Sequence, residues 1–419
     1  MSKIRPIEDI LDSISVTHKF DKDKLVFLNT SDVLEGKILI DDYMHVDDMK
    51  GQAKKTIKNG DILFSEIRPK NKRYAFVNVP NPEDYVVSTK LMVLRNKTKD
   101  VLTKYVYYFL TYEGTLNYLQ MRAENRIGSF PQITYDILKE LKVNVPETNI
   151  QQRIVDVISA LDAKIELNQR INTELESMAK TLYDYWFVQF DFPNEKGKPY
   201  KSAGGKMVWS EELKREIPLG WSDGVISDFA DVIDPHPSHR APVEVKEGFP
   251  FAGIGDIDKE GNIDLSKARL INEDFVNKQE KDYEITNNSI GYGRVGTVGK
   301  VVKLRKQSFR YAISPTLSMI NPKERYASFV YVTVNDKYFY NMVIRKMSGS
   351  TRPAVGIQEL RRIPIIAIPE KHASILAKFE LIASYCIKQA DIINKESQTL
   401  TELRDWLLPM LMNGQVTIK

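Results

Sequence analysis

The chain has 419 residues, of which 42% are hydrophobic, and its net charge is only +4. This length predicts two or three domains, and the apolar share excludes wholesale disorder. A single cysteine excludes an internal disulfide and a cysteine-based metal site. Because the opening residues lack an apolar signal-peptide core and no apolar run approaches 18 residues, we expect a soluble, cytoplasmic protein with no membrane partner.

The second half of the chain repeats the plan of the first. The apolar strand KVNVP ends at Pro146 and IIAIP ends at Pro369, and each is followed by a long helical pattern. Further upstream, GDILFSEIRPKNKRYAF faces NSIGYGRVGTVGKVV. The predicted order is a strand-rich domain (1–145), a long helix (146–190), an irregular linker (191–212), a second strand-rich domain (213–368) and a second long helix (369–419).

Residues recur every seven positions in both helices, and each member of the second series lies 225 residues after its counterpart. The two series are Ile154, Leu161, Asn168, Leu175 and Leu182, and Phe379, Cys386, Ile393, Leu400 and Leu407. A helix from about 150 to 187 would be roughly 55 Å long, which predicts an antiparallel partner helix with Asn168 as a register device. The alternative is an ordinary amphipathic helix on its own globular core. Ile158, Ile165 and Trp186 are expected to leave part of the helix surface uncovered for a partner.

Each domain also carries a basic, hydroxyl-rich strand-and-loop region, in which cations can neutralise phosphates and polar groups can read base edges. In the first domain the candidate DNA-binding residues are Ser65, Arg68, Lys70, Lys72, Arg73, Arg122, Arg126 and Ser129. In the second they are Tyr292, Arg294, Thr297, Lys300, Arg305, Lys306, Arg310, Arg345, Lys346, Ser350 and Arg352. The alternative for any one of them is a solvated surface role. Their recurrence at matching places in both halves favours nucleic-acid binding.

The run GYGRVGTVG at 291–299 matches the glycine spacing of a dinucleotide-binding loop. That fingerprint requires a helix to follow, together with an acidic residue about 20 positions later. The sequence that follows is β-branched and predicts a strand, and no acid occurs from 285 to 322. We therefore interpret the glycines as a tight turn that brings backbone close to DNA, with an oxidoreductase as the rejected alternative.

No catalytic constellation is visible in the sequence. A phosphate-binding loop is lacking, and Cys386 lies on the helix series as a core residue. His236 and His239 could share a metal with Asp231 or Asp234, but they lie in a Pro-rich loop, which favours ordinary loop polarity over a metal site. We predict a binding subunit with no catalytic residue, metal or cofactor of its own. The remaining alternative is a helical interaction scaffold that does not read DNA.

Three stretches resemble a known family: residues 128–221, the run GSTRPAVGIQELRRIPIIAIP and the run LRDWLLPMLMNGQV. The sequence resembles the specificity (S) subunit of type I restriction–modification enzymes. The resemblance implies an α+β fold in which two similar target-recognition domains are separated by two long antiparallel, coiled-coil-like helices with a pseudo-two-fold repeat. The first domain departs from the pattern, because it begins almost directly at IEDILDSIS whereas the second opens with EIPLGW.

The resemblance also implies what the chain would do. Each domain would contact one part of a bipartite, asymmetric sequence in double-stranded DNA. The helices would fix the gap between the two parts and dock two methyltransferase (modification) subunits, with restriction subunits joining later. Adenine methylation with S-adenosylmethionine would belong to the partner subunits, so that this chain contributes to host defence as a DNA reader and not as an enzyme.

Overall fold

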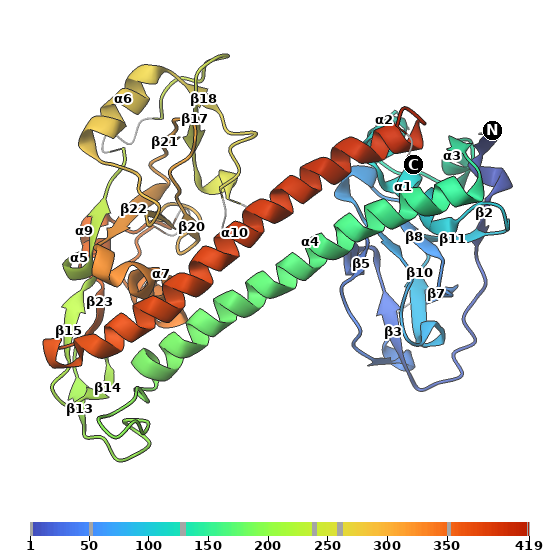
Figure 1. The fold of residues 1–419 in the computed structure, drawn as a ribbon. Helices are drawn as coiled ribbons and strands as arrows, with labels where there is room; N and C mark the ends of the chain where they lie inside the picture. The colour runs from blue at the N-terminus through green and yellow to red at the C-terminus, as the bar shows by residue number, and fades with distance from the viewer. Residues whose placement is uncertain are drawn as a thin grey trace. The chain divides into compact units, whose positions relative to one another are not determined.

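The computed structural model describes residues 3–49, 53–125, 131–236, 241–257, 263–349, 353–416 and 418. The chain divides into two compact units, one formed by Met1–Gln169 with Asn394–Lys419 and the other by Arg170–Ile393. Both long helices, α4 (Thr148–Tyr183) and α10 (Ala373–Met412), contribute to both units, so each unit holds one strand-rich domain and a stretch of each helix (Figure 1).

A four-stranded antiparallel sheet, in the order β2–β11–β8–β9, forms the centre of the first domain. Side chains alternate between its faces, so Ile62 and Phe64 pack with the helices while Leu63 packs toward a second sheet. That second sheet has the order β6–β3–β10–β7, with β3 and β10 parallel. Two further antiparallel pairs are β1–β12 and β4–β5. The sheet of the first domain is therefore buried on both faces.

The strands of the first unit are β1 (Lys3–Pro6), β2 (Leu11–Ile14), β3 (Lys24–Leu28), β4 (Val33–Leu34), β5 (Lys37–Ile38), β6 (Met44–His45), β7 (Ala53–Thr56), β8 (Ile62–Ser65), β9 (Tyr74–Phe76), β10 (Tyr85–Ser88), β11 (Leu91–Asn96) and β12 (Lys142–Val145). Its shorter helices are α1 (Thr103–Thr111), α2 (Glu113–Glu124) and α3 (Tyr135–Lys139).

The second domain repeats this topology. Its central sheet has the order β16–β22–β19–β20, and its parallel pair β17–β21 corresponds to β3–β10. The terminal pair β15–β23 corresponds to β1–β12. The equal-length helices α1 and α7 (Ala327–Asn335) stand at matching places in the two element orders. The structure thus confirms the predicted α+β fold with an internal repeat.

The strands of the second unit are β13 (Met207–Ser210), β14 (Arg215–Pro218), β15 (Ser222–Val225), β16 (Ala230–Ile233), β17 (Phe249–Ala252), β18 (Leu270–Ile271), β19 (Ile290–Gly293), β20 (Val301–Lys303), β21 (Ala312–Ile313), β22 (Leu317–Pro322) and β23 (Pro364–Ala367). Its other short helices are α5 (Ile226–Phe229), α6 (Glu273–Asp282), α8 (Lys337–Ile344) and α9 (Ile357–Arg361). Strand β20 follows the glycine run where a dinucleotide-binding fold would have a helix.

The two long helices run antiparallel within each unit. In the first unit, Arg404 on α10 donates to Asp162 on α4 at 3.1 Å, as expected for a polar contact at the edge of a helix seam. In the second unit, the rings of Tyr183 and Phe379 lie 6.1 Å apart. A π-helical turn, Asp184–Val188, ends the first helix. The antiparallel pairing that the sequence predicted is therefore present in both units.

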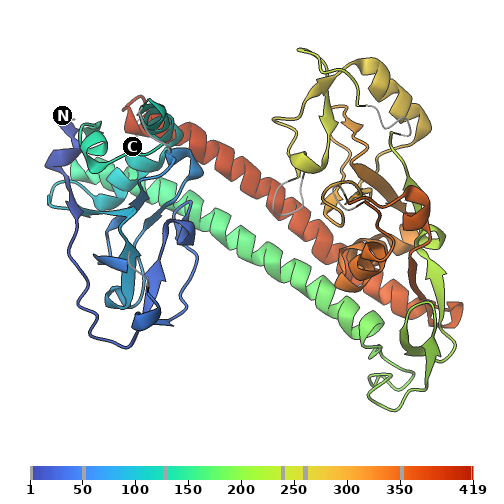
Figure 2. The ribbon, with the colours of Figure 1, turned by 180° about the vertical axis from the view of Figure 1, so that it is seen from behind.

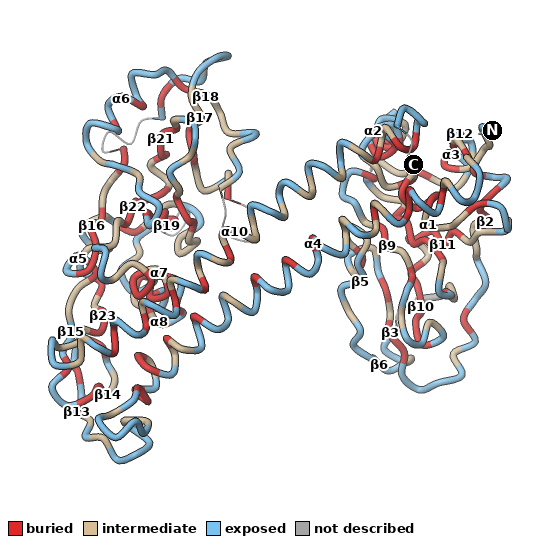
Figure 3. Tube along the Cα trace, viewed as in Figure 1, coloured by how far each residue is buried: buried red, intermediate tan, exposed pale blue. Residues whose placement is uncertain are grey.

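The seam between the helices is built on the predicted seven-residue series plus the residues four positions later. Of the ten series members, Ile154, Asn168, Phe379 and Cys386 are buried and the other six are half-buried. The positions four later, such as Ile158, Ala179 and Ala383, are buried as well. Buried and exposed positions alternate along both helices accordingly (Figure 3).

This seam corrects one expectation. Ile158, Ile165 and Trp186 are expected from the sequence to leave helix surface uncovered, but all three are buried. Several of the exposed apolar residues lie three positions after the series, as Met178 and Ile382 do. The reason is geometric, because a helix offers the rows at plus three and plus four on opposite sides of the series row, and only one of them can face the partner helix.

The predicted irregular linker is packed against the second domain. Residues 190–206 contain neither helix nor strand, but Phe190 and Phe192 are buried in the main core of that unit. The ring of Phe192 stacks on Trp221 at 4.9 Å, and Trp221 donates to His372 at 2.8 Å. Strand β13 then begins inside the predicted linker range. This segment is thus held by aromatic packing although it has no regular structure.

Candidate nucleic-acid interface

Equivalent turns follow β8 and β19 in the two domains. In the first, the backbone N–H of Ser65 donates to the carbonyl of Arg73 at 2.8 Å. In the second, the N–H of Gly293 donates to the carbonyl of Lys300 at 2.7 Å. We call residues 66–73 the β8–β9 turn and residues 294–300 the β19–β20 turn. They are the segments that face each other in the sequence repeat and carry candidate DNA-binding residues.

The two turns have left-handed residues at corresponding places. Arg68 and Lys72 have left-handed φ angles of 45° and 53°, and Gly296 and Gly299 have φ angles of 80° and 92°. The N–H of Arg68 donates to the carbonyl of Pro131 at 3.1 Å, and the N–H of Gly296 donates to Pro353 at 2.9 Å. The β8–β9 turn is one residue longer and contains a 3-10 turn, Pro69–Asn71. The domains therefore form related turns, with glycine at the left-handed positions in only one of them.

Two glycines of the run at 291–299 are explained by packing inside the domain. A Cβ at Gly293 would lie 2.4 Å from the carbonyl oxygen of Thr297, and a Cβ at Gly299 would lie 2.3 Å from the ring of Tyr340. Both distances are too short for non-bonded atoms, so at these two positions the close approach is to the domain's own chain. A Cβ at Gly296 would meet no atom within 4 Å, and the positive φ angle is what favours glycine there.

Each turn lies against a short helix whose exposed side chains extend the surface. The backbone N–H of Lys70 donates to Gln120 on α2 at 3.2 Å, which holds the β8–β9 turn against that helix. On the same helix, Arg122 donates to the hydroxyl of Tyr118 at 2.9 Å. In the second domain, Tyr340 of α8 covers the β19–β20 turn. Figure 2 shows the ribbon from behind, with α4 in green and α10 in red.

Seven of the predicted residues have exposed side chains, and they lie in the two turns, at the end of α8 or close to these segments. They are Arg68, Lys70 and Lys72 in the first domain and Thr297, Lys306, Arg345 and Lys346 in the second. Arg122 is half-buried against Tyr118, and Lys72 lies 3.4 Å from the carboxylate of Glu35. Lys306 lies 3.5 Å from Glu284 in an exposed ion pair, which costs little to rearrange. The exposed set defines one candidate DNA-binding surface in each domain.

Three predicted residues are inside their domain instead. Ser65 is buried and hydrogen-bonds with the backbone of its own turn, and Tyr292 has no exposed surface. Arg294 is buried, and both oxygens of Asp234 lie 3.1 Å from its guanidinium. A buried side chain offers no atom to a DNA duplex, so these three do not belong to the surface that the sequence predicted. Strands β8 and β19 are central in their sheets, which explains the burial.

Four further cations have partners within their own unit. Arg73 donates to the carbonyl of Ser31 at 2.8 Å, and Lys300 donates to the carbonyl of Ile257 at 2.8 Å. Arg305 forms an ion pair with Asp391. Arg310 donates hydrogen bonds to Glu280, Glu273 and Asn277, and those to the carboxylates of Glu280 and Glu273 raise the pKa of Arg310. Arg305 and Arg310 thus each have acidic partners within their own unit, and their DNA contacts stay a prediction.

Four predicted residues, Arg126, Ser129, Ser350 and Arg352, lie outside the described residues, and so does His239 of the alternative metal site. Its companion His236 is buried, and its backbone N–H donates to Asp234 at 3.1 Å. Within the described ranges, no group of three or more His, Cys, Asp or Glu side chains is arranged to hold a metal ion. None of the helices described combines the length and apolarity that crossing a bilayer requires.

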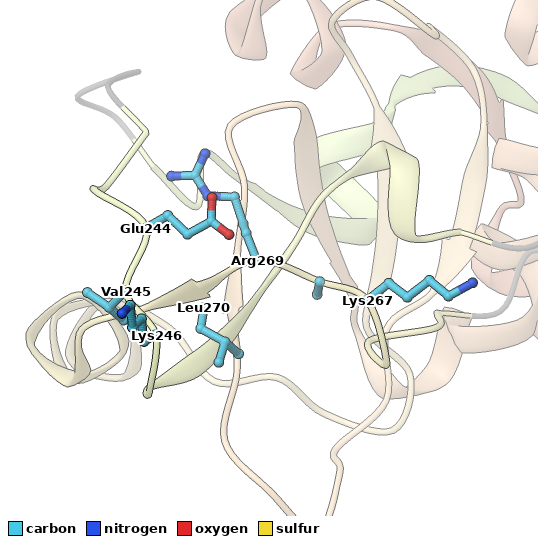
Figure 4. A pocket seen from close by; sticks show the side chains of 7 residues that line it. Glu244, Val245, Lys246, Lys267, Arg269 and Leu270 are labelled. Carbon is cyan, nitrogen blue, oxygen red and sulfur yellow. The ribbon is translucent and has the colours of Figure 1, made fainter. Parts of the chain in front are cut away.

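A shallow groove that the sequence did not indicate lies beside β18 in the second domain. Figure 4 shows its lining side chains, which include Lys246, Lys267, Arg269 and one acid, Glu244. The guanidinium of Arg269 lies 5.4 Å from the ring centre of Phe251. This groove adds positive charge to the second domain. The sequence did not reveal this groove because its residues come from two separate loops of mixed charge.

The sequence also missed two exposed polar residues beside the predicted surfaces. Tyr118 on α2 is 40% exposed and lies one helical turn before Arg122. Asn341 is exposed on α8, four residues before Arg345. The spacing of four residues from a predicted cation places each on the same helix face, and this was the signal that could have found them.

Comparison with known proteins agrees with this architecture. The family described as type I restriction modification DNA specificity domain matches residues 3–177. The chain is 32% identical to the HindI specificity subunit of Haemophilus influenzae over 457 aligned positions, which cover 96% of this chain and 97% of that protein. It is 25% identical to the MjaIX specificity subunit of Methanocaldococcus jannaschii over 329 aligned positions, which cover 76% and 70% of the two chains.

A solved structure shares the fold. The crystal structure of the S subunit of a type I restriction–modification system from M. genitalium superposes with a TM-score of 0.52 at 16% identity, covering 98% of this chain and 96% of that one. The fold, its internal repeat and the extent of the similarity to the Haemophilus protein together assign the family. The chain belongs to the specificity subunits of type I restriction enzymes.

Proposed function

We propose that this chain is the DNA-recognition subunit of a type I restriction–modification complex and reads a bipartite, asymmetric sequence in double-stranded DNA. The repeat carries the proposal, because the two domains build related turns at equivalent places in their sheets and present different side chains on them. Arg68 and Lys70 stand on one turn, and Thr297 stands on the other. Two copies of one scaffold with different surfaces would read two different half-sites, which makes the whole target asymmetric.

The proposed partners of the helices are two methyltransferase subunits. Along the part of α4 and its π turn in the second unit, Ile171, Met178 and Tyr185 are exposed at seven-residue intervals. On α10 in the same unit, Tyr385 and Ile392 are each 62% exposed and also seven residues apart. Rows of this kind leave apolar helix surface in water, which is typical of a surface that a partner covers.

In the first unit the corresponding exposed apolar residues are Leu167 on α4 and Leu403 and Trp406 on α10. Each unit thus offers its own apolar row, which favours two partner copies. Restriction subunits would join the assembled modification complex. Adenine methylation with S-adenosylmethionine would be carried out by the partners, so we propose no catalytic residue and no cofactor for this chain, which would act in the cytoplasm.

Co-expression with the cognate methyltransferase subunit tests this function. We expect adenine methylation at a bipartite motif that changes when the β19–β20 turn of the second domain is replaced, with one part of the motif retained. Methylation at a single continuous site, or at a motif that does not depend on this chain, would contradict the proposal. This assay does not require the isolated chain to be purified or to bind DNA without its partners.

A second experiment separates a DNA reader from a helical interaction scaffold. Replacing Lys70, Lys72, Arg345 and Lys346 by Ala removes exposed cations from both candidate surfaces. A DNA reader should bind DNA more weakly and show a shallower dependence on salt, by about one in slope for each phosphate that is no longer neutralised. The control replaces Lys278 and Lys281, exposed on α6, by Ala. Equal binding of both variants would favour the scaffold.

A further inference from the structure

Lys303 connects the central sheet of the second domain to both long helices. Its neighbours Val302 and Leu304 pack into a core on the other side of the sheet, so alternation along β20 turns Lys303 toward the helices. Its Nζ lies 3.2 Å from Asp391 on α10 and 3.5 Å from Glu176 on α4. Only 5% of its side chain is exposed. One buried ammonium group therefore contacts both helices.

The surroundings of Lys303 favour its charged form. Burial by itself lowers the pKa of the Lys303 ammonium, but the nearby Tyr331, Asp391 and Glu176 outweigh it and leave the pKa above its usual range. The ammonium also lies 5.2 Å from the centre of the Tyr331 ring. Arg305 binds the other oxygen of Asp391. The contact is thus a charged cluster shielded from solvent on the domain side.

The fold does not require a charge at this position. In the first domain, Phe76 pairs with Ile62 across β8 and β9, as Lys303 pairs with Ile290 across β19 and β20. Phe76 packs on the ring of Tyr107 with ring centres 5.7 Å apart. Tyr107 holds the fifth position of α1, which is the position of Tyr331 in α7. The residue at the equivalent strand position of the first domain is therefore apolar, although the Lys104 ammonium lies 6.0 Å from the centre of its ring, and ion pairs made from this position belong to the second domain.

The cluster lies at the base of the hairpin that carries the candidate DNA-binding turn. Lys303 is the last residue of β20 and follows Lys300, the last residue of the β19–β20 turn, by three positions. Three residues of a strand span about 10 Å. A small rotation of the domain about the helices would therefore move the turn directly, and the ion pairs oppose that rotation because breaking them would leave buried charge unpaired.

We propose that Lys303 is a positioning residue for gap recognition. By holding the second domain in one orientation on both helices, it would restrict the assembled complex to one length of DNA between the two parts of its target. Each added base pair moves a half-site by about 3.4 Å and rotates it by roughly 35°, so a domain held firmly cannot follow it. This inference rests on the proposed function and deepens it, because it assigns part of the gap preference to the anchoring of a domain and not to helix length.

The test uses the complete complex with its methyltransferase partners. Methylation rates are measured on duplexes with the native gap and with gaps one base pair shorter and longer, and on native-gap duplexes with single base changes in the second half-site. For Lys303→Met we expect the preference for the native gap to fall by about tenfold, equivalent to about 1.4 kcal/mol. Discrimination between bases in the half-site should stay as in the wild type.

Asp391→Asn provides an independent variant, because it weakens the contacts to α10 while Glu176 still faces Lys303. It should relax the gap preference in the same direction. Lys303→Arg keeps the charge and should keep the preference. Lys281→Met, on exposed α6, is the matched control and should behave as the wild type.

An unchanged gap preference in both Lys303→Met and Asp391→Asn would overturn the inference. A joint loss of gap preference and base discrimination would overturn it as well, because it would mean that the cluster only keeps the domain folded. If the wild-type complex shows no bipartite target at all, the proposed function fails first. The two failures are therefore distinguishable.

Discussion

Arg68 and Gly296 adopt the same left-handed backbone conformation at equivalent positions of the two domains, with φ angles of 45° and 80°. A non-glycine residue in this region carries a strain of about 1–2 kcal/mol. The first domain tolerates this strain at a position where the second uses glycine. The exposed arginine at the tip of the turn is then best explained by a surface role that outweighs its conformational cost.

Replacing Arg68 should therefore have opposite effects on stability and on DNA binding. Arg68→Gly should raise the free energy of unfolding by about 0.5–1 kcal/mol, because glycine relieves the strain. It should also weaken DNA binding. Arg68→Ala is the matched control, since it removes the same charge but keeps the Cβ and the strain. Denaturant unfolding and a binding titration measure both quantities, and equal stabilities of the two variants would contradict the role of strain.

The exposed and buried arginines of the second domain should respond differently. Arg345→Ala removes an exposed cation at the end of α8, so it should weaken DNA binding, reduce the salt dependence by about one unit of slope and leave the thermal midpoint unchanged. Arg294→Met leaves Asp234 without its buried partner, which should destabilise the domain by about 3 kcal/mol. Calorimetry and binding at several salt concentrations distinguish them. A loss of DNA affinity in Arg294→Met without loss of stability would show that our assignment of the buried arginine is wrong.

Partner docking should depend on the exposed apolar row. Tyr385→Glu and Met178→Glu place a charge among exposed apolar side chains and should weaken methyltransferase-subunit binding by about 100-fold or more, equivalent to about 3 kcal/mol. The thermal midpoint of the chain should change little, because neither side chain is in the helix seam. Lys198→Glu, on the packed linker, is the control. Calorimetric titration measures the binding of the methyltransferase subunit. If both helix variants bind it as tightly as the wild type does, the docking surface lies elsewhere.

A carboxylate of α10 holds a short helix of the second domain. Glu380 accepts backbone hydrogen bonds from Ser328 at 3.0 Å and Phe329 at 2.8 Å, at the start of α7. Burial raises the pKa of Glu380 above its usual range, and the two N–H groups only partly offset it. Glu380→Ala should lower the free energy of unfolding by about 1–2 kcal/mol, because two helix N-terminal donors lose their acceptor. Thermal or denaturant unfolding measures this change in the free energy of unfolding.

The raised pKa of the Glu380 carboxyl group predicts that the free energy of unfolding depends on pH. Since the folded pKa is above the unfolded value of about 4.3, folding favours the protonated acid, and its contribution to stability falls as pH rises through the folded pKa. The difference in unfolding free energy between wild type and Glu380→Gln should therefore decrease as pH rises from 4 toward neutrality and then become constant. A difference that grows with pH would contradict the raised pKa.

Sequence patterns were sufficient for the repeat and the long helices, since α4 lies within the predicted range 146–190 and α10 within 369–419. They could not show which apolar row of each helix is covered. Ile165 and Met178 are both apolar and both lie beside the seven-residue series, yet only Ile165 is buried. The choice depends on the facing helix, where small residues such as Ala383 and Ala390 line the seam. The residues of the facing helix that decide which row is covered are distant in the sequence, so the pattern of one helix alone does not reveal the choice.

The candidate surface was predicted less completely for a similar reason. Arg305 and Arg310 look like solvent-facing cations in a segment without acids, but the fold brings Asp391 and Glu280 to them from other elements. Arg345 and Lys346, at the end of a helix, are exposed as expected. Local composition shows where positive charge is, whereas the tertiary contacts decide which cations remain available to a ligand.

Single-molecule sequencing of DNA methylation, in cells that express this chain with its methyltransferase partner, tests the proposed role of the chain as a DNA reader. We expect adenine methylation at one bipartite, asymmetric motif with a fixed gap, present only when the chain is expressed. Exchange of the second domain should change one part of the motif alone. A continuous motif, or the same motif in cells that lack this chain, would show that the chain does not select the target in this way.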